Sequence, residues 1–324
     1  MHTTRGLLLA ALICGTPTAA PAIEGSTLAG PIGGTDIRTA QLPPPGLYGG
    51  VGLLAAEAFD FVDAQGKTIP ALGAAHLQRL RSGPFLLYVP EFQFLGGSFG
   101  VLGVLPNGVE CGRLFAATPT RCIGGLGDPY VEIAWSRFFG TVRASRFPDA
   151  FPILEGLAVA TGFGAVFPIG RYDPVLANNQ GLTIGNNVWD FAPNVAFTYT
   201  TRPIIAEGTE ISAKLFWNNY LTNPATQYTT GTVLNVDFAV SERIGRFQIG
   251  AAGFYAVQVA DDRQFGRPVP PDGRRGEAMQ IGPIVGYDMP ELAATMKFKV
   301  LASVITANTV KAHGFVLTFA KKFQ

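Results

Sequence analysis

The clearest pattern in the chain is an alternation of apolar and polar side chains over residues 189–200. One parity is apolar and largely aromatic, comprising Trp189, Phe191, Pro193, Val195, Phe197 and Tyr199. The other parity is polar or small, comprising Asp190, Ala192, Asn194, Ala196, Thr198 and Thr200. A period of two places successive side chains on opposite faces of a β-strand. The segment therefore predicts a strand whose apolar face lies against either a protein core or lipid.

Weaker versions of this alternation recur along the chain and predict about twelve strands. The predicted strands are residues 47–61, 75–94, 99–105, 129–139, 153–167, 186–200, 207–220, 228–240, 246–259, 277–288, 292–306 and 310–323. Residues 106–128 and 168–185 are predicted as long loops. Connections at one end are mostly long and those at the other end mostly short, which is typical of the outer loops and periplasmic turns of bacterial barrels.

Composition indicates which medium the apolar faces contact. Charged residues make up 15% of the chain and its mean hydropathy is +0.25, whereas an ordinary soluble domain is about 25% charged. The polar parities carry mostly Asn, Gln, Thr, Ala and Gly. After the N-terminal region there is no run of about 18 uncharged apolar residues, and the closed β-barrel is the other structure that can span a bilayer.

These features predict an all-β fold, a transmembrane antiparallel up-and-down β-barrel in the outer membrane of a Gram-negative bacterium. A soluble β-sandwich, whose strands are also half-buried, is the alternative. The barrel prediction implies outer-membrane lipid and the barrel-assembly machinery as partners. The formal net charge of +1 gives no reason to expect nucleic acid.

The N-terminus has the pattern of a secretory signal peptide, predicted as residues 1–22. Arg5 is followed by an apolar stretch at residues 6–15 and by the small residues Ala20, Pro21 and Ala22. Residues 23–46 are rich in Gly and Pro and are predicted as a periplasmic lead-in, partly folded into the barrel mouth. The barrel is predicted as residues 47–324.

Two cysteines remain after the signal peptide. Cys111 and Cys122 lie in one Gly-rich segment of an exported chain. An oxidising compartment favours a disulfide between them, with two free thiols as the alternative.

The polar parities of the predicted strands supply the candidates for the lining of the lumen. These candidates are Glu132, Asp190, Asn194, Glu210, Lys214, Asn218, Asn235, Asp237, Gln248, Gln258, Gln280, Lys297, Lys299 and Ser303. Two interpretations remain open: an ion-pair network that plugs the bore, or a polar channel. Phe216, Phe254 and Leu301 share the inward parity and indicate an apolar patch. The predicted anchors at the membrane interface are Trp135, Trp189, Tyr199 and Trp217.

The sequence offers little catalytic chemistry. His313 near an outer turn could join a Ser on the barrel wall, as in a membrane-embedded lipid hydrolase, but a solitary interface histidine is the simpler interpretation. Asp261, Asp262 and Asp272 could bind a divalent cation, yet the interleaved arginines favour a solvated loop with local ion pairs. We predict no enzyme activity, no metal site and no cofactor.

Several motifs resemble those of a known family. They are PPPGLY (43–48), FLGGSFG (94–100), GLGDPYVE (125–132), GRYDPVLANNQGLTIGNNVWDFAPNVAFTY (170–199), NNYLTNPATQY (218–228) and QVADDRQ (258–264). Together they resemble the outer-membrane family associated with the meta-cleavage pathway of phenol degradation. The cysteine loop and the terminal Phe323-Gln324 depart from that family's pattern.

The resemblance implies a monomeric barrel that transports aromatic or other hydrophobic compounds. We therefore predict an outer-membrane channel for small hydrophobic or aromatic solutes, which cross by facilitated diffusion. Residues 168–185 are predicted to form an extracellular loop that gates the mouth. The alternative is a non-transporting structural or partner-binding barrel that uses residues 260–276 and the cysteine loop as its outer surface.

Overall fold

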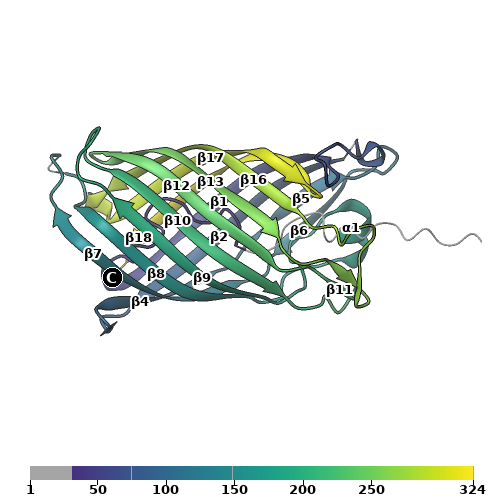
Figure 1. Cartoon of the computed structure of the whole chain (residues 1–324), viewed down its shortest axis with the longest axis horizontal. Helices are drawn as coiled ribbons and strands as arrows, with labels where there is room; N and C mark the ends of the chain where they lie inside the picture. Colours follow the sequence, from purple (N-terminus) through teal and green to yellow (C-terminus); the bar gives the residue numbers. More distant parts are fainter. Residues whose placement is uncertain (1–30, 74, 148, 324) are drawn as a thin grey trace, which may run out of the picture.

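Antiparallel strands close into a barrel in the computed structural model, which describes residues 31–73, 75–147 and 149–323 (Figure 1). The wall has twelve strands, as predicted. They are β1 (Gly46–Phe61), β2 (His76–Val89), β4 (Gly97–Val104) continued by β5 (Asn107–Arg113), β6 (Arg121–Leu126) continued by β7 (Tyr130–Arg143), β8 (Ile153–Val166), β9 (Asp190–Thr200), β10 (Thr209–Tyr220), β12 (Val233–Ile244), β13 (Phe247–Gln258), β16 (Glu277–Met289), β17 (Ala294–Ala307) and β18 (Val310–Lys322). The fold-class prediction is confirmed. The predicted signal peptide lies outside the described residues.

The barrel closes between its first and last strands. β1 pairs with β18 from Tyr48 opposite Lys322 to Phe61 opposite Val310. β2 pairs with β5 along its first half and with β4 along its second half, so β4 and β5 act as one wall strand. Closure satisfies the backbone groups that an open sheet would leave at its edges.

One prediction about the strands was wrong. Residues 106–128 were expected to form a loop, but β5 and β6 extend the wall there as a paired hairpin. Pro106 and the surrounding glycines break the alternation that would have shown these strands in the sequence. The outer edge of β6 is covered by Arg171, whose backbone N–H donates to Leu126 O at 2.7 Å.

Short elements lie outside the wall. They are β3 (Gln93–Phe94), β11 (Tyr228–Thr229), β14 (Arg263–Gln264), β15 (Arg267–Pro268), the helix α1 (Pro174–Gln180) and the 3₁₀ turns η2 (Pro70–Leu72) and η3 (Pro290–Leu292). α1, β5, β6 and β11 gather at one end of the barrel, and the C-terminus lies at the other (Figure 1). The end with the long connections is the extracellular end of such barrels, and the end with short turns is periplasmic.

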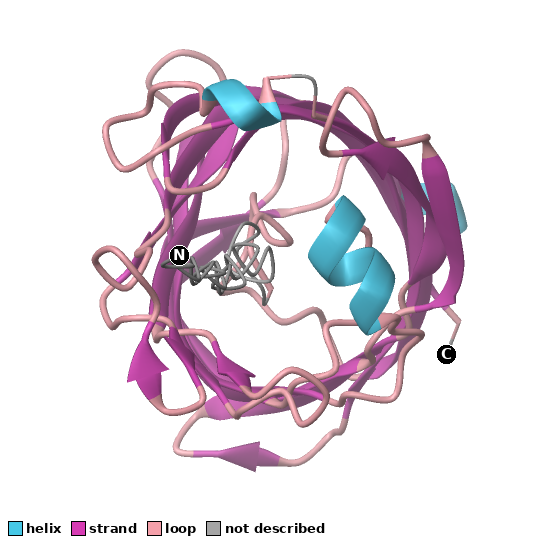
Figure 2. Cartoon of the chain, turned by 90° about the vertical axis from the view of Figure 1, so that its right-hand side faces the viewer, coloured by secondary structure: helices cyan, strands magenta, loops and turns pink. Residues whose placement is uncertain are grey.

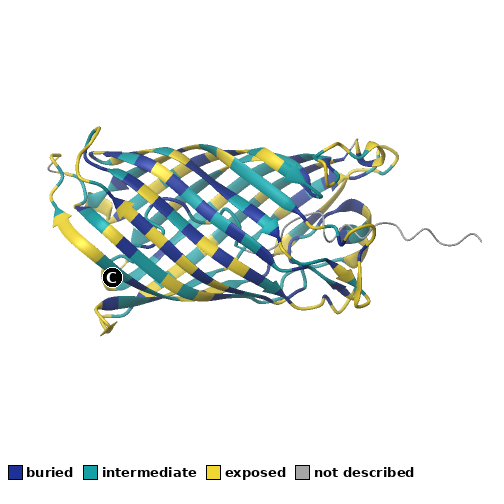
Figure 3. Ribbon diagram, viewed as in Figure 1, coloured by how far each residue is buried: buried dark blue, intermediate teal, exposed yellow. Residues whose placement is uncertain are grey.

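Burial follows the period of two, with polar side chains inside and apolar side chains outside (Figure 3). On β10, Ile211 and Trp217 are 51% and 54% exposed, whereas Asn218 is 0% exposed. A soluble sandwich would show the opposite arrangement. The exposed apolar belt of a closed barrel is the surface that faces lipid, so the chain is an outer-membrane barrel. Within the described residues, no helix is long and apolar enough to cross a membrane.

Candidate functional site

The predicted lumen residues lie on the inward parity of their strands. Those that are buried are Glu132, Asp190, Asn194, Glu210, Lys214, Asn218, Asn235, Asp237, Gln248, Gln258 and Lys299. Those that are partly buried are Gln280, Lys297 and Ser303. Contacts with other parts of the chain across the lumen account for much of this burial, and two such parts stand out. We call residues 31–45 the plug segment and residues 167–189 the lid loop.

The plug segment runs through the barrel toward the start of β1 (Figure 1). The sequence predicted a periplasmic lead-in over residues 23–46, partly folded into the barrel mouth, and the part of it that the structure describes lies inside the lumen. It has no regular secondary structure. Its backbone groups must therefore find partners on the barrel wall, because a buried unpaired N–H or C=O is costly. The wall provides them through the polar parity of the strands.

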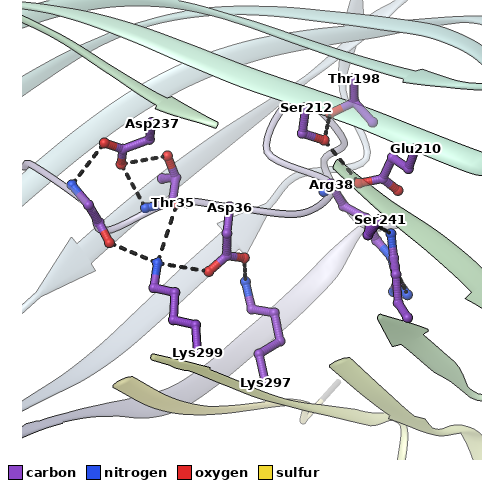
Figure 4. Close-up of polar contacts among 12 residues, drawn as sticks. Thr35, Asp36, Arg38, Thr198, Glu210, Ser212, Asp237, Ser241, Lys297 and Lys299 are labelled. Atoms are coloured by element: carbon purple, nitrogen blue, oxygen red, sulfur yellow. Dashed lines mark hydrogen bonds and ion pairs between the residues drawn. The ribbon is translucent and has the colours of Figure 1, made fainter. Parts of the chain in front are cut away.

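Asp36 joins the plug segment to β17. Its carboxylate is ion-paired with Lys297 and, at 3.1 Å, with the Lys299 ammonium group (Figure 4). Lys299 also donates to Gly33 O at 2.8 Å. Burial acts to raise the pKa of Asp36, but the charges and hydrogen bonds of the two lysines outweigh it and lower the pKa to about 2. Asp36 is therefore ionised at every physiological pH.

Arg38 joins the plug segment to β10, β13 and β16. Its guanidinium donates to Asp288 Oδ2 and to Gln248 Oε1, both at 2.8 Å. The Arg38 backbone N–H donates to Glu210 Oε1 at 2.6 Å. A second cation, Arg243, lies 2.9 Å from Asp288 Oδ2. The fork of an arginine suits a planar carboxylate, so this contact fixes the orientation of the segment.

Asp237 on β12 binds the start of the plug segment. Its carboxylate accepts hydrogen bonds from Gly33 N at 2.8 Å and from Thr35 N and Thr35 Oγ1, both at 2.9 Å (Figure 4). Further along, Ala40 N donates to Thr198 Oγ1 at 3.1 Å. The plug segment is therefore hydrogen-bonded to several different wall strands.

Other lumen residues pair with one another. Lys214 donates to Glu132 Oε1 at 2.6 Å, and Tyr130 Oη donates to Glu132 Oε2 at 2.7 Å. Asn218 Nδ2 donates to Asn235 Oδ1 at 2.8 Å. Among the predicted lumen residues, both carboxylate oxygens of Asp190 and Oδ1 of Asn218 stay unsatisfied.

The lid loop lies at the extracellular mouth. Viewed from that end, α1 lies inside the ring of strands (Figure 2). Asp173 caps the helix by accepting from Val175 N at 2.9 Å and Leu176 N at 3.1 Å, and Gly181 ends it in the left-handed conformation at φ 66°.

Apolar packing holds the lid loop in place. Leu182 and Ile184 are buried, and Leu176 packs against the same cluster. The wall side of the cluster includes Leu77 and Ile123. The other members are Ala58, Phe61, Leu72, Ala75, Leu114 and Val310. Polar contacts add to the packing, since Asp128 accepts from Gly170 N at 2.8 Å and Asn186 N at 2.6 Å.

The cysteine hairpin supports the mouth. Cys111 on β5 and Cys122 on β6 are opposite each other and form a disulfide. The neighbouring Glu110 is 0% exposed and pairs with Arg79 at 2.6 Å and Arg81 at 2.8 Å. Arg81 also donates to Thr183 O of the lid loop at 2.5 Å. The hairpin is thereby tied to the lid loop.

The predicted anchors are on the outer surface. Trp189, Tyr199 and Trp217 are 37%, 48% and 54% exposed. Trp189 and Tyr199 flank the two ends of β9, and Trp135 donates its Nε1–H to Phe94 O at 2.8 Å. Aromatic side chains with one polar atom suit the two boundaries between lipid and water.

The structure gives His313 a different partner from the one that a hydrolase needs. Its Nε2 lies 3.4 Å from Glu57, which also contacts His76 at 2.7 Å. No Ser–His contact is found in the part of the chain that the structure describes. In the same part, no group of three or more His, Cys, Asp or Glu is placed to hold a metal ion.

The sequence analysis missed the residues that hold the plug segment. Asp36 and Arg38 are charged positions in a Gly/Pro-rich segment without a period, and Arg243 and Asp288 were not on the lumen list. The available signal was the three charged residues in residues 23–46, Glu24, Asp36 and Arg38, since charges are scarce in this chain.

The fold and the lumen define an outer-membrane β-barrel. The family model with the description "Putative MetA-pathway of phenol degradation" matches residues 58–319, and the chain belongs to this family. The resemblance noted in the sequence is thus confirmed. No curated protein matches the chain.

Two solved structures share the fold. An outer membrane channel from Pseudomonas putida F1 has a TM-score of 0.71 at 13% identity, covering 89% of this chain and 100% of its own. The transport unit of the autotransporter AIDA-I from Escherichia coli has a TM-score of 0.54 at 8% identity, covering 89% of this chain and 93% of its own. At these identities the likeness is one of fold.

Proposed function

We propose that the chain is an outer-membrane channel through which small hydrophobic or aromatic compounds cross by facilitated diffusion. The observation that carries this proposal is that a peptide segment, rather than wall side chains alone, occupies the lumen. A bore that accommodates residues 31–45 becomes a passage when that segment leaves. The polar residues of the lumen wall provide contacts for polar groups of a solute, and the apolar residues among them provide contacts for its apolar groups.

The comparisons support the proposal. The family name refers to phenol degradation, and the solved structure with the higher TM-score is an outer membrane channel. The lumen candidates of the sequence analysis are then the residues that a passing solute meets. Lipid surrounds the apolar belt, and the barrel-assembly machinery would insert the barrel.

The alternative is a barrel that does not transport. The observation that favours it is the obstruction of the lumen at two levels, by the plug segment and by the lid loop. A barrel whose obstruction is permanent would present its extracellular loops to a partner instead.

Reconstitution separates the two functions. Purified barrel in liposomes is tested for swelling with small sugars and for uptake of toluene and phenol, beside the Asp36→Ala variant, which loses both lysine pairs. The channel proposal expects uptake of the aromatic solutes by the wild type and faster uptake by the variant. Liposomes that stay impermeable with both proteins would contradict it.

We infer no catalytic role. The candidate histidine, His313, is engaged by Glu57 on the outer wall. Assay of lipid hydrolysis by the reconstituted barrel, compared with His313→Ala, tests this inference, and activity that the substitution abolishes would overturn it.

A further inference from the structure

Asp190 differs from the other acidic residues of the lumen. It is 1% exposed, it faces inward at the start of β9, and neither of its carboxylate oxygens has a hydrogen-bond partner. The backbone N–H of Asn219 approaches the carboxylate without reaching hydrogen-bond geometry. Two positions before Tyr220, on the same parity of β10, Asn218 is 0% exposed and also leaves its Oδ1 unpaired.

The contrast with the other lumen carboxylates is direct. Glu132 accepts from Lys214, Asp36 from two lysines, and Asp237 from the plug segment. The lumen lysines are thus engaged elsewhere. A buried carboxylate without a donor is strongly destabilising. A molecule that supplies a donor therefore gains more at Asp190 than at any of these satisfied groups.

A buried apolar cluster lies beside these two acceptors. Tyr220 is the register partner of Asp190 across the strand pair, and it is buried in a cluster with Val188, two positions before Asp190. The other members of the cluster are Val233, Phe254, Ala256 and Leu301, with Ile32 and Ala278 packed against it. The cluster includes two of the three inward apolar residues noted in the sequence, Phe254 and Leu301.

We propose that Asp190 and Asn218 form the polar end of a solute-binding site in the lumen, with the Tyr220 cluster as its apolar wall. The ligand is a small molecule with an apolar, preferably aromatic body and a hydrogen-bond-donating head group. The inference rests on the proposed channel function and adds to it the chemistry that the channel selects.

The chemistry of the unpaired atoms determines the ligand class. When Asp190 is ionised, it and Asn218 Oδ1 offer acceptors only, so an anionic head group is repelled and an aliphatic or aromatic hydrocarbon leaves the acceptors unpaired. A hydroxyl and an ammonium group both satisfy them, and the ammonium adds an opposite charge. A site that hydrogen-bonds a head group discriminates strongly against the analogue that lacks it.

The test uses the refolded barrel in detergent and isothermal titration with phenol, benzylamine and toluene, which separate hydroxyl donor, ammonium donor and no donor. Asp190→Leu removes the acceptors, and Asp190→Asn keeps the shape and one acceptor. Asp149→Leu, at a turn position that is 77% exposed, is the matched control. Heat-modifiable migration in gels verifies that each variant is folded.

We expect phenol and benzylamine to bind the wild type more tightly than toluene. Asp190→Leu should weaken both donor ligands roughly ten- to a hundredfold and change toluene by less than about threefold. The affinity of Asp190→Asn for the two donor ligands should lie between those of the wild type and Asp190→Leu. Asp149→Leu should bind all three ligands as the wild type does. A larger loss for benzylamine than for phenol assigns the ammonium as the preferred head group.

Two results would overturn the inference. One is that phenol and toluene bind the wild type equally, or that no ligand binds it. The other is that Asp190→Leu weakens all three ligands alike. Uptake into liposomes is measured separately, so a channel that transports phenol without binding it at Asp190 refutes the site alone, whereas absence of uptake refutes the proposed function.

Discussion

The plug segment and the lid loop obstruct the same lumen through opposite kinds of contact. The plug segment is held mainly by charge, since Asp36 pairs with two lysines and Arg38 with Asp288, while Ile37 and Ala40 pack in small apolar clusters. The lid loop is held by apolar packing, in which Leu182 is 0% exposed. The contacts on the periplasmic side are therefore polar and depend on direction. Those on the extracellular side are apolar and depend less on the exact geometry.

The difference indicates how each obstruction responds to its surroundings. Ion pairs depend on salt and pH, and removing one partner leaves the other charge buried and unpaired. Apolar packing is indifferent to pH, but a hydrophobic solute can compete for the same surface. On the proposed channel function, a solute arriving from outside would meet the apolar lid loop first.

Removing the carboxylate of Asp36 should have the largest effect, because it should loosen the plug segment and leave the lid loop in place. Asp36→Ala leaves Lys297 and Lys299 without their partner, which weakens docking of the plug segment by about 3–5 kcal/mol, the usual cost of breaking a buried pair. Planar-bilayer recordings should show a higher conductance. The lid loop should keep its protection from hydrogen exchange.

The control for this variant is Asp149→Ala, which removes a carboxylate from an exposed turn. An Asp36→Ala barrel with the conductance of the wild type would show that the plug segment does not depend on these ion pairs.

Truncating Leu182 should affect the lid loop and spare the plug segment. Leu182→Ala removes a fully buried side chain, at a cost of about 2–5 kcal/mol. Amide exchange in residues 174–186 should accelerate, while the backbone amides of Gly33 and Thr35 stay protected. Val175→Ala is the matched control, because Val175 is 63% exposed. Equal acceleration in both variants would contradict the role of apolar packing.

Opening the disulfide tests whether the cysteine hairpin supports the lid loop. The loop closed by Cys111 and Cys122 spans 11 positions, for which chain entropy gives about 3 kcal/mol as an upper limit. The double variant Cys111→Ser/Cys122→Ser should loosen the hairpin and, through Ile123, the lid loop, with a smaller effect than Leu182→Ala. If the conductance of the double variant rises as much as that of Asp36→Ala, the hairpin supports the plug segment instead of the lid loop.

Much of the wall could be predicted from the sequence because lipid enforces the alternation. On β9 the outward residues are apolar and the inward ones are small or polar, so parity alone separates Phe197 from Thr198. The same rule fails at β5 and β6. There Pro106 and the glycines interrupt the pattern, and part of the hairpin extends beyond β8.

The obstruction of the lumen could not be predicted in the same way. The plug segment has no period, and its partners are far away in the chain: Arg38 and Asp288 are separated by 250 positions. The sequence suggested inward lysines and carboxylates, but not that Lys297 and Lys299 pair with Asp36. Nor could it show that Asp190 lacks a partner, because that depends on where every other donor lies.

Acidification should have the smallest effect through Asp36, and it also acts on the wall carboxylates Glu210, Asp237 and Asp288 that contact the plug segment. The pKa of Asp36 in the folded barrel is about 2, below its ordinary value of 3.8. Because the pKa of Asp36 is depressed in the folded barrel, its ionised carboxylate stabilises the folded state by roughly 2 kcal/mol. This stabilisation is fully present above pH 3.8, the ordinary pKa, and is lost as the pH falls through the folded-state pKa. Conductance should therefore be constant between about pH 7 and pH 5 and rise only below about pH 4. The Asp36→Ala variant should lack that rise, and a wild-type barrel that opens near pH 6 would point to one of these wall carboxylates instead of Asp36.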